Sequence, residues 1–157
     1  MSAFEKKITL FLVSGAGVGY IPAIPGTVGT LLAIPLSLGL TRIAAVSFPL
    51  GILTLIGFIA CAIWLSSNGA AILGQKDPQV IVIDEIAGFM VAYFLAPFRW
   101  LPLASAFLLF RFFDIAKVFP ASRLESLPGG SGIVLDDVTA GIYTFIILRL
   151  MFAWDLL

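Results

Sequence analysis

The sequence predicts an all-α fold, a polytopic membrane-embedded helical bundle of about five or six segments. Of its 157 residues, 61% are hydrophobic and 11% are charged, and this charged fraction is less than half of the about 25% that is typical of soluble proteins. The charges are also unevenly placed, because none lies within residues 8–41 or 43–75. A helix that spans a bilayer needs roughly 20 apolar residues, so each stretch is long enough to cross. We expect residues 1–157 to form a single membrane-embedded domain.

The first charge-free stretch is expected to be broken near Pro22–Gly26. An interior proline costs a helix about 3 kcal/mol, and Pro22 and Pro25 stand in a glycine-rich segment. We predict one helix to about Gly19, an irregular turn, and a second helix from about Thr27. Irregular backbone at membrane depth persists only where protein or a water-filled cavity covers it. The break is therefore a candidate element of a functional site.

Two lysines precede this stretch. Lys6 and Lys7 followed by an apolar run resemble the start of a signal peptide, but the run is longer than a signal peptide's and continues into the break. We therefore expect the segment to be retained. Because Lys and Arg favour the cytoplasmic side of a membrane, the amino terminus is predicted to be cytoplasmic.

The second charge-free stretch contains the clearest single spanning helix, at Ile43–Leu65. Three shorter apolar runs follow, at Val80–Pro97, Leu101–Phe119 and Ile133–Leu156, and turn-forming residues separate them. Each of the three carries ionisable residues, which are costly inside a membrane and indicate function by default. The seven are Asp84, Glu85, Arg111, Asp114, Lys117, Asp136 and Asp137.

The composition excludes several kinds of chemistry. The chain has no histidine, which removes histidine acid–base relays, serine–histidine–aspartate triads and the usual zinc sites. Nine basic and nine acidic residues give a formal net charge of zero, so no basic surface for nucleic acid is expected. Cys61 is the only cysteine and has no neighbouring cation in the sequence, which argues against a reactive thiolate. Any catalysis must use carboxylates, hydroxyls, Lys, Arg or a bound metal.

The seven ionisable residues predict a metal site if they converge. Their five carboxylates and two cations leave a local charge of −3, and a low-dielectric bundle does not hold such a charge without counter-ions. One Mg²⁺ would leave −1 and two would leave +1. Carboxylate oxygens suit Mg²⁺ better than a metal that prefers thiols or imidazoles. The carboxylates are therefore candidate ligands for one or two such ions.

Two of the segments have similar sequences, which supports convergence. Asp84-Glu85 and Asp136-Asp137 are each followed within about one helical turn by an Ala-Gly pair. Small residues three or four positions along share the helix face with the acids and allow close backbone approach. Two helices that meet at these positions would bring the acidic pairs together.

In the third segment, Arg111, Asp114 and Lys117 are spaced by three residues, which places them on one broad helix face. For Asp114 and for the Asp136-Asp137 pair, purely structural explanations remain open. Asp114 would then be only a salt-bridge partner of one of the two cations. Asp136-Asp137 would then complement the dipole at the start of a helix that follows the glycine-rich loop.

Four motifs follow one another along the chain. They are Pro25-Gly26-Thr27-Val28-Gly29-Thr30, Asp84-Glu85-x-x-Gly88, Phe110-Arg111-x-x-Asp114-x-x-Lys117 and Gly129-Gly130-x-Gly132-Ile133-x-x-Asp136-Asp137-x-x-Ala140-Gly141. Each is weak alone, but in this order and spacing they resemble the phosphatidylglycerophosphatase A family over about residues 12–150. One departure is Val118, where the family usually has a proline directly after the lysine. The helix is therefore expected to run further before it ends.

The resemblance implies Mg²⁺-dependent removal of the terminal phosphate from phosphatidylglycerophosphate, giving phosphatidylglycerol. It places the chain in a bacterial inner membrane as a multi-pass protein whose active site faces the cytoplasm. Asp84, Glu85, Asp136 and Asp137 would hold one or two Mg²⁺. Asp114 would be a further ligand or the base that takes a proton from water.

The same resemblance assigns residues to the substrate. Arg111 and Lys117 would neutralise the phosphate oxygens. Thr27 would either begin a helix whose free backbone N–H groups face the phosphate or be an ordinary N-cap. Gly26 and Thr30 of the same motif are predicted to contact the substrate. The predicted catalytic residues are Asp84, Asp114, Asp137, Arg111 and Lys117.

Three alternatives remain beside this hypothesis. A covalent aspartyl-phosphate route is possible, although the chain has no Asp-x-Asp-x-Thr motif, and direct attack by water is favoured. A lipid phosphotransferase would need regularly spaced aspartates that are not found here. A small cation transporter or channel subunit would also have intramembrane carboxylates and a broken helix. Against it, Arg111 and Lys117 suit an anionic substrate better than a cation pathway.

Overall fold

The computed structural model describes residues 1–157 and contains seven α-helices, one short 3₁₀ helix and no strand. The all-α prediction is confirmed. Six of the helices correspond to the expected segments, and the seventh, α6, is a single turn that was not expected. The elements are α1 (Ala3–Val13), η1 (Val18–Tyr20), α2 (Pro25–Val46), α3 (Phe48–Leu73), α4 (Ile83–Ala92), α5 (Trp100–Ala116), α6 (Ala121–Leu124) and α7 (Gly130–Ala153).

The break in the first apolar stretch is present but longer than expected. Helix α1 ends at Val13 rather than near Gly19, and α2 begins at Pro25. Gly15 and Gly17 have φ values of 57° and 95°, a left-handed conformation that glycine adopts without steric cost. The chain therefore leaves the helix early and runs irregularly, apart from η1, until Pro25.

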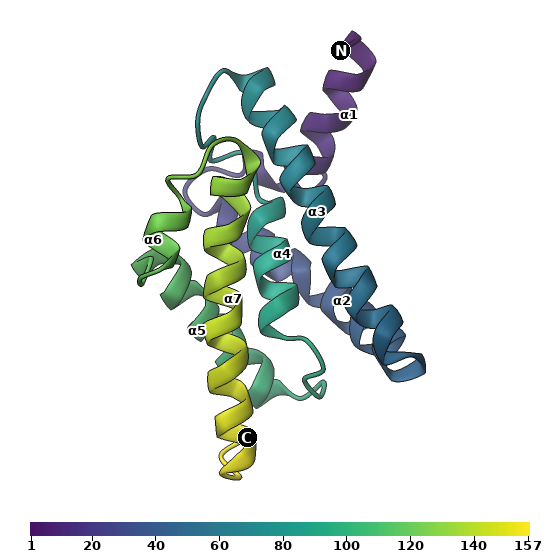
Figure 1. Cartoon of the computed structure of the whole chain (residues 1–157), viewed down its shortest axis with the longest axis vertical. Coiled ribbons are helices and arrows are strands. Elements are labelled where there is room, and N and C mark those ends of the chain that lie inside the picture. Colours follow the sequence, from purple (N-terminus) through teal and green to yellow (C-terminus); the bar gives the residue numbers. More distant parts are fainter.

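The prediction of one spanning helix at Ile43–Leu65 is wrong. Ser47 has extended backbone angles of φ −152° and ψ 110°, and it separates α2 from α3. The reason is Pro49, because a proline inside a helix removes a hydrogen bond and clashes with the carbonyl four residues before it, whereas the first turn tolerates it. The two helices form an antiparallel pair (Figure 1) in which Gly51 packs directly on Ala44.

Helices α2 and α3, of 22 and 26 residues, are the two that are long and apolar enough to cross a membrane, by length and composition. Large apolar side chains on both remain exposed, among them Leu36, Leu53 and Ile56. Contiguous exposed apolar surface of this kind is typical of a lipid-facing or partner-facing surface.

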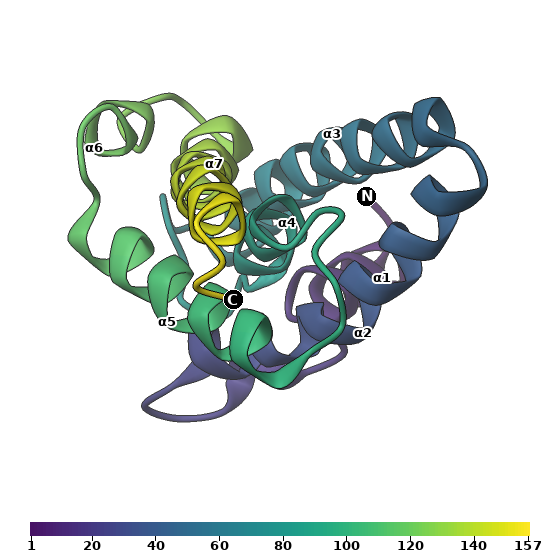
Figure 2. The same ribbon diagram turned by 90° about the horizontal axis from the view of Figure 1, so that it is seen from below.

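Helix α4 lies at the centre of the bundle, surrounded by α2, α3, α5 and α7 (Figure 2). Eight of its ten residues are buried. Ten residues span about 15 Å, half of the roughly 30 Å of a bilayer core, so the predicted run Val80–Pro97 forms a buried half-length helix. The backbone N–H of Val82 donates to the Val13 carbonyl at 2.9 Å, which ties the start of α4 to the end of α1.

An aromatic cluster supports the lower part of α4. The Phe89 ring lies 5.9 Å from the Tyr93 ring and 5.9 Å from the Phe110 ring of α5, centroid to centroid. All three side chains are fully buried. Their packing fixes the position of α4 against α5.

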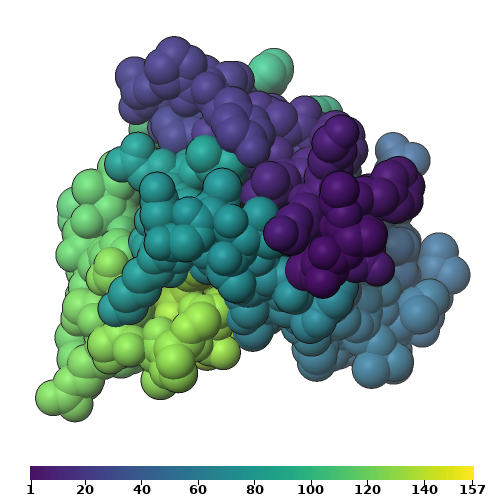
Figure 3. Space-filling model, turned by 90° about the horizontal axis from the view of Figure 1, so that it is seen from above, coloured from purple at the N-terminus to yellow at the C-terminus, as the bar shows by residue number.

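The loops gather at one end of the molecule. Figure 3 views this end, where the dark blue segment that leads into α2, the teal α3–α4 connection and the light green segment before α7 lie close together. Helix α1 begins at the same end (Figure 1). The first turn of α4, which carries Asp84 and Glu85, and the early turns of α7 lie beneath these loops (Figure 1).

Candidate functional site

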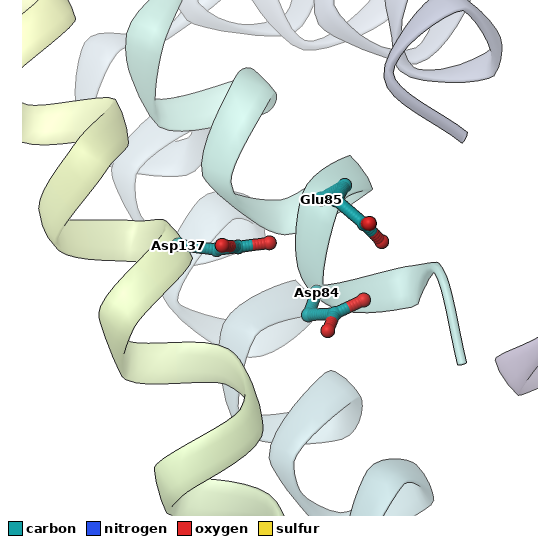
Figure 4. A group of neighbouring side chains, drawn as sticks. All are labelled: Asp84, Glu85 and Asp137. Carbon is teal, nitrogen blue, oxygen red and sulfur yellow. The ribbon is translucent and has the colours of Figure 1, made fainter. Parts of the chain in front are cut away.

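Three carboxylates converge between α4 and α7. Asp84 and Glu85 come from the first turn of α4, Asp137 comes from the third turn of α7, and the three side chains point toward one another (Figure 4). One oxygen from each lies within 4.8 Å of the others. Asp84 is 8% exposed and Asp137 is 4% exposed. This set, here called the carboxylate triad, is a concentration of like charge in a buried place.

The close contact of α4 with α7 depends on two glycines. A Cβ atom on Gly88 would lie 2.6 Å from the carbonyl oxygen of Asp137, and one on Gly141 would collide with the carbonyl of Gly88. Separations this short leave no room for any side chain. The expectation that the two acid–Ala–Gly segments meet is confirmed, and their glycines are the reason that the acids lie side by side.

The two cations pair with the remaining carboxylates. Arg111 Nη1 donates to Asp114 Oδ2 at 2.5 Å and lies 3.9 Å from Glu85 Oε1. Lys117 Nζ lies 2.9 Å from Asp136 Oδ2. The five predicted metal ligands therefore divide into the triad and two ion-paired aspartates. Asp114 thus forms the salt bridge with Arg111 that the structural alternative described.

All of these groups line one cavity. Its volume is about 510 Å³, and its wall includes the five carboxylates, both cations, the irregular segment 19–24 and the start of α2. The predicted role of the break as part of a site wall is thus matched by its position. A space of this size can hold a small organic molecule as well as an ion.

Gly26 and Thr27 line the cavity, whereas Thr30 does not. A Cβ on Gly26 would collide with Glu85 Oε1 and lie 3.1 Å from Arg111 Nη1, so Gly26 lets the α2 backbone approach the triad. Thr27 is the third residue of α2 and is not its N-cap, a position that Ile24 holds. Thr30 is fully buried and its hydroxyl donates to the Gly26 carbonyl at 2.8 Å.

Two expectations about helix positions are corrected. Lys117 does not continue the α5 face, because it is the C-cap of α5 with a left-handed φ of 44°; its side chain still reaches Asp136 from there. The helix also ends at Ala116, although no proline follows Lys117 directly.

Asp136 and Asp137 lie well past the first turn of α7, beyond the reach of the helix dipole. The explanation that they complement the dipole at the helix start therefore does not apply to them.

Sequence reasoning missed Glu125, Asp77 and Gln79. Glu125 Oε1 lies 2.9 Å from Lys117 Nζ, and Asp77 and Gln79 line the cavity from the α3–α4 connection. No periodic pattern in the sequence marks these positions, since irregular backbone brings them to the site.

The triad fits a divalent cation. Two triad oxygens, Asp84 Oδ1 and Glu85 Oε2, are buried and have no hydrogen-bond partner within the protein, and the same is true of Asp136 Oδ1 outside the triad. Buried polar atoms are normally paired, and three neighbouring carboxylates without an adequate counter-charge are costly to bury. Arg111 alone approaches the triad, at 3.9 Å from Glu85. Oxygen donors with free lone pairs are the ligands that hard cations such as Mg²⁺ take.

A buried carboxylate triad beside two cations in one cavity is an arrangement that suits the hydrolysis of a phosphorylated substrate. The chain is a member of the phosphatidylglycerophosphatase A family, whose sequence model matches residues 11–152. It is therefore a lipid phosphatase, and the cation-carrier alternative is set aside.

Individual relatives agree with this membership. A Haemophilus influenzae protein named phosphatidylglycerophosphatase A is 37% identical over 158 residues, covering 96% of this chain and 96% of that protein. An Escherichia coli protein of the same name is 32% identical over 133 residues, covering 83% and 76%. A Bacteroides thetaiotaomicron protein with the provisional name phosphatidylinositol-3-phosphatase is 32% identical over 148 residues, covering 90% and 91%. No solved structure matches the chain.

Proposed function

We propose that the protein hydrolyses the terminal phosphomonoester of phosphatidylglycerophosphate, with Mg²⁺ as cofactor, and releases phosphatidylglycerol and phosphate. The observation that carries the proposal is the placement of the carboxylate triad and both cations in one cavity. The substrate is taken from the names of the Haemophilus and Escherichia relatives. The whole chain would form a single domain embedded in a bacterial inner membrane.

Asp84, Glu85 and Asp137 would hold the metal ion, because their oxygens are the closest set and two of them have unpartnered atoms. A bound Mg²⁺ would polarise the phosphoryl oxygens and lower the pKa of a bound water. Asp136 is the next carboxylate in the cavity, and its Oδ1 is also unpartnered, so a second ion would have a ligand there.

Arg111 and Lys117 would bind the phosphate. A guanidinium offers a planar pair of donors that matches two phosphate oxygens, whereas an ammonium acts as a point charge. Asp114 holds the guanidinium through Nη1, which orients Arg111 toward the cavity. Asp114 Oδ1 is left free by that contact and is the atom that would accept a proton from the attacking water.

The start of α2 supplies neutral donors. The backbone N–H groups of Gly26 and Thr27 precede the first hydrogen bond of the helix, which Val28 donates to the Ile24 carbonyl. Unpaired N–H groups at a helix start favour a bound anion, and both residues line the same cavity as Arg111. We therefore place the phosphate between α2 and α5.

The proposed orientation puts the cavity at the cytoplasmic surface. Helix α1, which carries Lys6 and Lys7, begins at the end of the molecule where the loops gather, and the α3–α4 connection, which carries Lys76, is one of those loops (Figures 1 and 3). Positive residues near membrane segments favour the cytoplasmic side, and the cavity opens among the same loops.

The test is phosphate release by the purified protein in detergent–lipid mixed micelles, with a panel of phosphatidylglycerophosphate, phosphatidic acid and phosphatidylinositol 3-phosphate. We expect release from phosphatidylglycerophosphate with Mg²⁺ and none with excess chelator. Asp137→Asn should lower kcat/KM at least about a hundredfold, since changes even to the partners of metal ligands cost 10- to 100-fold. Asp155→Asn, at an exposed position after α7, should leave the rate unchanged.

Two results would contradict the proposal in different ways. Full activity in chelator would remove the metal from the mechanism. Preference for phosphatidylinositol 3-phosphate, the activity that the Bacteroides relative's name describes, would keep the phosphatase and replace its substrate.

A further inference from the structure

We propose that an apolar groove between α5 and α7 binds an acyl chain of the lipid substrate. The groove has a volume of about 260 Å³ and is lined by six residues, Phe113, Val118, Phe119, Tyr143, Ile146 and Ile147. The inference rests on the proposed function, because it names where the hydrophobic part of that substrate binds.

The groove offers contacts only to an apolar occupant. Five of its six lining side chains are hydrocarbon, and the sixth, Tyr143, donates its hydroxyl to the Phe119 carbonyl at 2.9 Å. Its polar atom is thus already paired, and its ring is left as apolar surface. A polar ligand would find no free donor among these side chains and only the Tyr143 hydroxyl oxygen as an acceptor, so it would lose most of its hydration without compensation.

The groove and the large cavity are lined by neighbouring residues at the end of α5. Phe113 directly precedes Asp114, and Val118 directly follows Lys117. Asp114 and Lys117 line the large cavity, while Phe113 and Val118 line the groove. The last turn of α5 and its C-cap therefore contribute residues both to the site for the head group and to the groove proposed for a chain.

The direction of the groove suits a chain that descends from the membrane surface. A helix rises 1.5 Å per residue, so along α7 Tyr143 lies about 9 Å and Ile147 about 15 Å beyond Asp137. That direction leads away from the end of the molecule where the loops gather (Figure 1). If the head group is bound at the surface, the groove extends from its depth into the hydrocarbon region.

The substrate's own chain is the occupant that these observations favour. A lipid phosphatase has a substrate whose phosphate and chains are joined, so a recess that adjoins the phosphate site is filled whenever the head group is bound. A bulk lipid or a second copy of the protein would fill the groove without any dependence on the substrate's chain length. Chain-length dependence is therefore the property that distinguishes them.

The experiment compares two forms of phosphatidylglycerophosphate, a long-chain dioleoyl form and a short-chain, water-soluble dihexanoyl form. Ile146→Trp adds bulk in the groove at a side chain that is 49% exposed. We expect it to lower kcat/KM for the dioleoyl substrate about tenfold, the lower range of what a few methylene contacts contribute. The dihexanoyl substrate should change less than about twofold, which also shows that the variant is folded.

The matched control is Ile56→Trp on α3, where the side chain is 58% exposed on another apolar face; it should affect neither substrate. Equal loss with both substrates, or no loss with either, would overturn the groove as an acyl site. The same holds if Ile24→Trp, at the rim of the large cavity, produces the chain-length effect in place of Ile146→Trp. A wild-type protein that hydrolyses a different lipid phosphate contradicts the proposed function instead, and the chain-length comparison on that lipid still tests the groove.

Discussion

At the scale of single residues, Arg111 connects the carboxylate triad with the rest of the cavity. Its Nη1 atom is bound to Asp114 and lies 3.9 Å from Glu85. One guanidinium nitrogen is thus committed to carboxylates, which leaves the other nitrogens to face a ligand. The fork geometry of arginine allows both functions at once, whereas lysine has one nitrogen for all contacts.

We therefore predict that Arg111→Lys lowers kcat/KM for lipid phosphate about 10- to 100-fold, since hydrogen bonds to charged groups contribute about 1.5–3 kcal/mol each. Steady-state kinetics in mixed micelles with saturating Mg²⁺ measure the effect. Arg42→Lys, at an exposed position on α2, is the control and should leave kcat/KM unchanged. An Arg111→Lys variant with normal kinetics would show that charge alone suffices at this position.

Lys117 shows how much of a site depends on local backbone. Its left-handed φ of 44° turns the chain at the end of α5, a conformation that non-glycine residues adopt at a cost of about 1–3 kcal/mol. The cost is offset by two carboxylates, Asp136 and Glu125, which each hold Nζ at 2.9 Å. The spacing by three residues placed Lys117 correctly near the acids but for a different geometric reason.

At the scale of elements, the contact of α4 with α7 sets the distance between the acids. Gly141 faces the carbonyl of Gly88, and an added Cβ would also lie 3.1 Å from Val91 Cβ. Neither helix has a flexible side chain at the contact that could move aside, since the colliding atom is backbone. Any side chain at Gly141 must push the helices apart and move Asp137 away from Asp84.

Gly141→Ala is thus expected to lower stability and activity together. Overpacking of this kind costs about 1–3 kcal/mol, so thermal unfolding in detergent should show a lower Tm, and phosphate release should fall. Gly57→Ala on α3 is a closely matched control, because nothing lies within 4 Å of the added atom and alanine is the better helix former. If the two variants behave alike, close packing at Gly141 does not position the triad.

The elements that could be predicted are those that local sequence determines. Glycine and proline near Pro25 foretold the break, and the repeated acid–Ala–Gly pattern foretold which helices meet. The early end of α1 and the break at Ser47 were not predicted. The break at Ser47 could have been inferred in part, because Pro49 is visible in the sequence. The long apolar run around it hid that signal, since hydrophobicity alone does not show where one helix stops.

The division of the five carboxylates could not be predicted from sequence. Asp84 and Asp136 stand in similar segments, yet Asp84 joins the triad while Asp136 pairs with Lys117. The difference arises from tertiary structure, because α6 and the turn at Lys117 bring a cation to one acid and not to the other. Glu125 was missed for the same reason. Spacing along one helix gives the face of a residue but not what lies opposite.

At the scale of the whole molecule, nine positive and nine negative charges balance but are not evenly distributed. The three buried carboxylates have Arg111 as their one nearby cation, 3.9 Å from Glu85 Oε1. Unpaired negative charge therefore remains inside the bundle, and its repulsion opposes folding. The fold is stable around this charge only if a cation binds or the burial of apolar surface elsewhere offsets it. If the triad binds a cation, we expect cation binding and folding to be coupled in this protein.

The coupling predicts a stability change that is independent of catalysis. A ligand that binds only the folded state stabilises it by RT ln(1 + [L]/Kd), about 2.7 kcal/mol at a concentration 100 times Kd. Mg²⁺ should therefore raise the Tm of the detergent-solubilised protein, while NaCl at the same ionic strength should not. Asp84→Asn removes one like charge, so without Mg²⁺ its Tm should be at or above the wild-type value, and Mg²⁺ should no longer raise it. An equal Mg²⁺ effect on wild type and Asp84→Asn would place the cation elsewhere. A wild-type Tm that does not respond to Mg²⁺ would mean that apolar packing alone stabilises the buried acids.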